Sequence, residues 1–124
     1  MTVTGVNDSV DDDNISYQIT LGAATSTDTS YSGLTPTPVS VLNTDNDTFG
    51  VTVSAISGNT TEAGGTATFT VVLNSQPTAS VSIGVTSSDT TEGTVSPASL
   101  TFTTGNWSTP QTVTVTGVND SVDD

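Results

Sequence analysis

The eleven residues Thr114–Asp124, TVTGVNDSVDD, repeat the residues Thr2–Asp12 letter for letter. The two copies begin 112 residues apart (114 − 2), so the chain holds slightly more than one period of a tandem array. Each copy joins alternating Thr and Val to an acidic loop, and alternation with period two is typical of a half-buried β-strand. We therefore expect a β-repeat protein in which the ends of this chain cut through a repeat.

Strand-like segments rich in Thr and Val alternate with turn residues along the whole chain. No segment has a helical period, and Pro97 interrupts one strand, which suits a sheet edge or a bulge. The predicted strands are 15–21, 39–42, 49–56, 66–73, 81–85, 94–102 and 111–118. Seven short strands in one period predict an all-β fold, a seven-strand immunoglobulin-like antiparallel sandwich.

All the charged side chains of this sequence are acidic. It has no Lys, Arg or His against 13 Asp and Glu, for a formal net charge of −13 at pH 7. Nothing could neutralise phosphate, which excludes nucleic acid as a partner and disfavours anionic membranes. The absence of His, Lys and Cys removes most nucleophiles, general bases and soft-metal ligands. Paired carboxylates without an aromatic cleft do not indicate a glycosidase, so no enzyme is predicted.

The acids are concentrated in alternate loops. We take 49–56 as strand one and 111–118 as strand five. Because the sequence repeats, 15–21 and 39–42 then follow as strands six and seven. The loops after odd-numbered strands then share one end of an up-and-down sandwich. Of the acidic residues, only Asp28 lies outside these loops. The loops carry Asp8, Asp11, Asp12, Asp13, Asp45, Asp47, Glu62, Asp89, Glu92, Asp120, Asp123 and Asp124.

Oxygen ligands in flexible loops suit Ca²⁺ better than Mg²⁺, which demands tight octahedral geometry. We therefore predict a calcium site at this end of the sandwich. The alternative is a set of solvated turn residues, since Asp is common in turns.

Three segments resemble the Calx-β family and its bacterial tandem relatives. They are TEAGGTATFTVVLN (61–74), the acidic loop after VTVTGVND (113–120), and VSVLNTDND (39–47) leading into TFGVTVS. The resemblance implies a seven-strand sandwich that binds calcium at one pole. The ligands that it implies are Glu62, Asp89, Asp120 with Asp123 and Asp124 or the counterparts Asp8, Asp11 and Asp12, and Asp45 with Asp47. The closing run here is DND rather than three consecutive acids.

The linker between the last and first strands is short. The residues from Asn43 to Thr48 reach at most about 20 Å, whereas a nine-residue strand spans roughly 30 Å. We therefore expect 1–47 to be the C-terminal part of one repeat (the end of strand five with strands six and seven). Residues 48–124 would be strands one to five of the next. Strand exchange between copies would then complete each sandwich head to tail.

The function that this pattern predicts is a non-catalytic, calcium-binding spacer in a large secreted surface or adhesion protein. One alternative is a module that binds a glycan or a protein through the loops around Trp107 or Tyr31. Another is a calcium sensor in a regulatory protein. Trp107 is expected to plug the core, and Tyr17, which alternates with Ile15 and Ile19, to face it.

Overall fold

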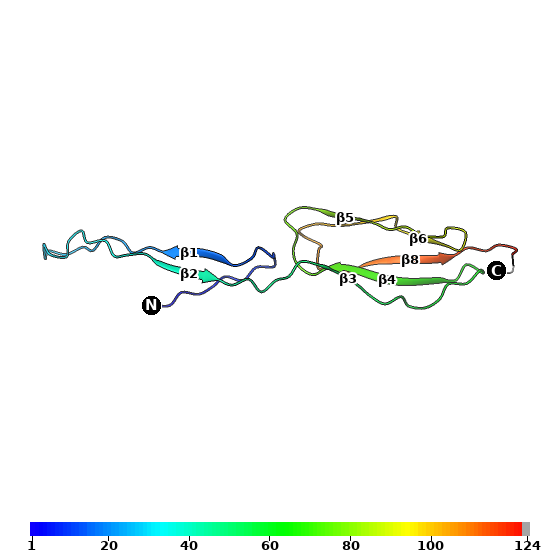
Figure 1. The fold of residues 1–124 in the computed structure, drawn as a ribbon, viewed down its shortest axis with the longest axis horizontal. Coiled ribbons are helices and arrows are strands. Elements are labelled where there is room, and N and C mark those ends of the chain that lie inside the picture. Colours follow the sequence, from blue (N-terminus) through cyan, green and yellow to red (C-terminus); the bar gives the residue numbers. More distant parts are fainter. Residues whose placement is uncertain (123–124) are drawn as a thin grey trace. The chain divides into compact units, whose positions relative to one another are not determined.

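The computed structural model describes residues 1–122, which form eight strands in antiparallel sheets (Figure 1). The all-β prediction is confirmed. Within these residues no helix is long and apolar enough to cross a membrane. The strands are β1 (Ile15–Ile19), β2 (Val39–Asn43), β3 (Val51–Val53), β4 (Thr66–Leu73), β5 (Val81–Gly84), β6 (Gly93–Ser96), β7 (Ser99–Phe102) and β8 (Gln111–Gly117).

The chain forms two compact units. Unit 1 contains Met1–Asp8 and Asp12–Asn46, and unit 2 contains Ser9–Asp11 and the chain from Asp47 onward. Strands β2 and β3 are consecutive in the chain, yet they belong to different units and different sheets. The assignment of 1–47 and 48–124 to two successive repeats stays a prediction.

Unit 2 is a sandwich of two unequal sheets. One has the order β3-β4-β8-β6, and the other contains only β5 and β7. The alternation in β4 turns Val71 and Leu73 inward, where they pack with Val113 of β8 and with Leu100 and Phe102 of β7. Phe102 and Val113 are fully buried. Apolar area removed from water is the main term that holds the two sheets together.

The predicted strand 94–102 is wrong as a single element, because it forms two strands in different sheets. β6 pairs with β8, and β7 pairs with β5. The change of sheet falls at Pro97 and Ala98, and proline cannot donate to a ladder. Strands β1 and β3 are also shorter than predicted. The seven-strand immunoglobulin-like arrangement stays a prediction.

Unit 1 is built on the β1–β2 hairpin. Tyr17 lies opposite Val41, and Ile19 lies opposite Val39, so apolar side chains share one face. The amide of Asn43 donates to the carbonyl of Val6 at 3.4 Å and ties the N-terminal segment to the hairpin. Tyr17 is half-buried.

Trp107 packs against the core of unit 2, as predicted for a plug. Its carbonyl accepts a hydrogen bond from the backbone N–H of Leu73 at 3.3 Å. Tyr31, by contrast, is 61% exposed in unit 1.

Candidate functional site

Two loops of unit 2 bring three carboxylates around one pocket of about 340 Å³. Glu62 comes from the loop between β3 and β4, and Asp89 and Glu92 come from the loop between β5 and β6. All three residues are exposed. The rest of the lining is small or hydroxylated and consists of Thr60, Thr61, Ser87, Ser88 and Gly93. Oxygen atoms are therefore the only side-chain atoms of this pocket that could bind a cation.

The end of β8 holds both acidic loops. The N–H of Gly117 donates to the carbonyl of Gly65 at 3.0 Å, and the N–H of Val118 donates to the carbonyl of Glu92 at 2.8 Å. A side chain on Gly117 would overlap the main chain of Thr61. Glycine is therefore needed at the end of β8 because the Glu62 loop crosses it at close range.

Replacing Gly117 with alanine should push the Glu62 loop off β8, because neither backbone can yield without losing hydrogen bonds. We expect a destabilisation of about 1–3 kcal/mol, measured by urea unfolding. Gly84→Ala is the matched control, since a Cβ there meets no atom within 4 Å. Equal stability of the two variants would contradict the close approach.

Asp89 is held in its ionised form by its own turn. Thr91 donates to Oδ1 of Asp89 from its hydroxyl at 2.5 Å and from its backbone N–H at 3.0 Å. The hydroxyl bond, followed by the backbone bond, lowers the pKa of Asp89 below its ordinary value. Asp89 therefore stays a carboxylate at any pH near neutrality.

Thr91→Val should raise the pKa of Asp89 toward its ordinary value, because valine keeps the shape of threonine but removes the hydroxyl. The pKa is measured by NMR titration of the carboxyl carbon. In the native chain, the lowered pKa adds stability above the unfolded-state pKa, and this stability is lost as pH falls through the folded-state value. Thr90→Val is the control. An unchanged pKa in Thr91→Val would show that the hydroxyl bond does not form in solution.

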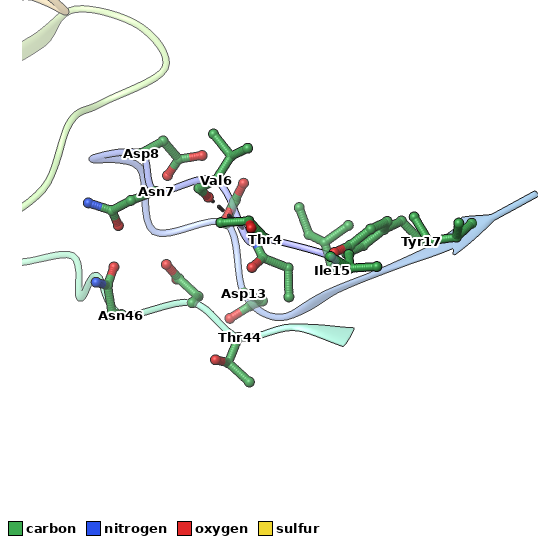
Figure 2. A pocket seen from close by; sticks show the side chains of 14 residues that line it. Thr4, Val6, Asn7, Asp8, Asp13, Ile15, Tyr17, Thr44 and Asn46 are labelled. Atoms are coloured by element: carbon green, nitrogen blue, oxygen red, sulfur yellow. Dashed lines mark hydrogen bonds between the residues drawn. The ribbon is translucent and has the colours of Figure 1, made fainter. Parts of the chain in front are cut away.

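A second group of acids lines a cavity of about 460 Å³ in unit 1 (Figure 2). Its carboxylates are Asp8, Asp12, Asp13 and Asp45. The N–H of Asp45 donates to the side-chain oxygen of Asn14 at 2.8 Å, which joins the loop after β2 to the start of β1. Asp13 has a φ of 60°, a left-handed conformation that aspartate tolerates better than most residues.

Asp11 and Asp47 belong to unit 2, whereas Asp8, Asp12, Asp13 and Asp45 belong to unit 1. Oδ2 of Asp11 accepts the backbone N–H of Phe49 at 3.0 Å, and the carbonyl of Ser9 accepts the N–H of Gln76 at 2.6 Å. Oδ2 of Asp47 is buried from solvent. The segment Ser9–Asp11 is thus an anchor of unit 2 that sequence reasoning did not foresee.

The remaining acidic side chains either accept a hydrogen bond within a local turn or lie outside residues 1–122. Oδ1 of Asp120 accepts the N–H of Val122 at 3.0 Å. Asp28, the predicted exception, accepts the N–H of Ser30 at 2.9 Å in unit 1. The predicted ligands Asp123 and Asp124 lie outside the described residues.

The acids that the sequence placed at one end are thus divided between the two units. In kind they fit a hard cation, because every side-chain donor is an oxygen. In position, no three acidic side chains within residues 1–122 are drawn together closely enough to hold a metal ion. A cation at either group would require the loops to close around it or to supply backbone carbonyls and water.

The turn of Asp89 could have been found from the sequence, because Asp followed two residues later by Thr is a common turn pattern. The close approach of Gly117 to Thr61 had no such signal. Searches of protein-family models, of curated protein sequences and of solved structures gave no match to this chain.

Proposed function

We propose that this chain is a non-catalytic structural repeat of a large extracellular surface or adhesion protein, and that its acidic loops bind calcium. One observation carries the proposal: two loops set Glu62, Asp89 and Glu92 around one pocket in a chain without a single Lys, Arg or His. Like charges in a compact state repel one another. Cations from solution would offset that repulsion.

The state of Asp89 supports cation binding over acid–base chemistry. A general acid near neutral pH needs a raised pKa, whereas hydrogen bonds from Thr91 lower the pKa of Asp89. A carboxylate that is ionised near neutral pH, in an exposed turn, can serve as a ligand for a hard cation. The exposed loops also suit the weak calcium sites of extracellular modules, for which Kd is about 10⁻⁴–10⁻³ M.

The tandem repeat supports a spacer over a switch. Eleven identical residues recur in the two copies, and each copy ends in the acidic run NDSVDD. An array of such units would carry the same acidic loop at regular intervals. Calcium in each loop would lower the repulsion along the array and stiffen it. The resemblance to Calx-β domains points in the same direction.

Calcium titration of the Asp89→Asn chain tests the proposal. Removing one carboxylate from the Glu62–Asp89–Glu92 pocket should weaken calcium binding at least about tenfold, since charge count sets affinity in such sites. Binding is measured by isothermal titration calorimetry at fixed ionic strength. Asp28→Asn is the matched control, because it removes the same charge from a loop of unit 1. Equal weakening by both variants, or no binding by the native chain at millimolar calcium, would refute the proposed site.

A further inference from the structure

We propose that the β1–β2 hairpin of one chain docks beside β5 of a second copy of the chain. The hairpin would extend the β5–β7 sheet to four strands and cover β3 of that copy. The proposal goes beyond the proposed function, and it needs no calcium site. It rests on an uncovered face of unit 2, a free strand edge next to that face, and a duplicated sequence.

The uncovered face is the inner face of β3. Val51 lies opposite Leu73 of β4, and Val53 lies opposite Val71, so each pair shares one face of the sheet. Leu73 and Val71 are 8% and 5% exposed, whereas Val51 and Val53 are 49% and 59% exposed. The core-facing side of this sheet is therefore covered at β4 and left open at β3.

The free edge belongs to β5. Among the strands of residues 1–122, β5 pairs only with β7. Only Pro97 and Ala98 separate β7 from β6. In the four-stranded sheet, β6 lies at one end and β3 at the other. β7 must therefore lie toward the β6 side, and the unpaired side of β5 faces the β3 side. A strand added to β5 would lie across from Val51 and Val53.

The β1–β2 hairpin has the shape that this gap requires. Its apolar face carries Tyr17, Ile19, Val39 and Val41, and its strands have five residues each. Val39 is 53% exposed. A two-stranded hairpin is marginally stable on its own, and it gains independent stability by joining a larger sheet.

The duplicated sequence favours a second copy of the chain as the occupant. Val3 and Val6 line the unit 1 cavity together with Ile15, Tyr17 and Ile19 of the hairpin. Figure 2 shows Val6, Ile15 and Tyr17 among them. In the second copy of the repeat, Val3 and Val6 recur as Val115 of β8 and Val118, which are half-buried in unit 2. The hairpin thus shares a cavity with one copy of TVTGV, and the other copy lies in the sandwich at the end of β8.

Within residues 1–122, each chain carries one β1–β2 hairpin and one unpaired edge of β5. The contact is therefore head-to-tail, and it produces a filament unless the rotation between copies closes a ring. The net charge of −13 on every copy opposes association. Salt should favour assembly, since the Debye length falls to about 3 Å at 1 M.

Sedimentation of the full chain with one added charge on β3 is the first test. In 1 M NaCl, the native chain should sediment as species heavier than 12.5 kDa whose share rises with concentration. Val53→Asp, on the uncovered face, should abolish them. Thr52→Asp is the control, because its side chain lies on the opposite face of β3. A native monomer at all concentrations, or equal loss in both variants, would overturn the proposal.

Disulfide trapping identifies the strand that receives the hairpin, and the chain has no native cysteine to interfere. Gln18→Cys of β1 and Ser40→Cys of β2, which lie directly opposite each other, are each mixed with Ser82→Cys of β5 on an isotopically labelled chain, all three positions being exposed. A disulfide forms only when the two Cα atoms lie within about 7 Å. A mixed dimer should therefore form under mild oxidation with the hairpin strand that lies next to β5.

Thr101→Cys of β7 is the control partner, because Thr101 lies directly opposite Ser82 but one strand farther from the added hairpin. Its yield of mixed dimer should be at least about tenfold lower, since each further strand adds about 4.8 Å. Equal yields would overturn the pairing with β5. An internal disulfide in a monomeric Gln18→Cys, Ser82→Cys double variant, with no mixed dimer, would also overturn it in favour of a rearranged single chain.

Discussion

Replacing Phe102 with alanine is expected to destabilise unit 2 by about 3–5 kcal/mol. Phe102 is fully buried at the end of β7, and it belongs to the cluster that joins the two sheets. Alanine removes the ring and leaves a cavity that the short strands around it cannot fill. Because a domain of this size has only about 5–15 kcal/mol of stability, the loss is a large part of it.

The melting temperature of Phe102→Ala should fall by about 12 °C or more, since 1 kcal/mol corresponds to about 4–8 °C in a domain of this size. Circular dichroism during heating measures it. Ile56→Ala is the control, because this side chain is 51% exposed and its loss should cost less than about 0.5 kcal/mol. A melting temperature within a few degrees of the native value would mean that Phe102 is not the centre of the core.

Calcium at about 100 times its Kd is expected to raise the melting temperature of the native chain by about 10–20 °C. A ligand that binds only the folded state at this excess adds about 2.7 kcal/mol, and each kcal/mol corresponds to about 4–8 °C. The physical source is the neutralisation of carboxylates that repel one another in a chain without cationic side chains. The melt is recorded in calcium and again after adding excess chelator.

Screening of charge must be separated from binding in this experiment. Sodium chloride at matched ionic strength screens all the carboxylates alike, so it should raise the melting temperature by less than half the calcium effect. Asp89→Asn should reduce the calcium effect while leaving the response to sodium chloride nearly unchanged. An identical melt in calcium and in chelator would rule out specific calcium binding in the folded state.

The strands that can be predicted from the sequence are those whose own alternation specifies them. The sequence predicts the strand 66–73 to the residue, because Thr66, Thr68 and Thr70 alternate with Ala67, Phe69 and Val71. The run 94–102 is predicted as a single strand, whereas it forms the two strands β6 and β7. Its pattern reads as one strand, and nothing local shows that the two sides of Pro97 pair with different partners.

The candidate site divides in the same way. The sequence placed Glu62, Asp89 and Glu92 in two loops that the structure brings to one pocket. It did not separate Asp11 and Asp47 from Asp45 and its neighbours. That separation depends on hydrogen bonds such as the one from Phe49 to Asp11, which spans 38 positions of the chain. Periodicity describes only residues close together in sequence, so it contains no information about such a contact.

By itself, the sequence determined that this chain is built of antiparallel strands, that its loops are acidic, and that it repeats. These properties follow from side-chain chemistry and spacing, which are local. Only the tertiary structure decided which strands share a sheet, and that the inner face of β3 is left open at Val51 and Val53. Burial depends on which surfaces meet across the fold. The meaning of the repeated segment TVTGVNDSVDD therefore depends on its surroundings, because Thr114–Gly117 forms strand and Thr2–Gly5 does not.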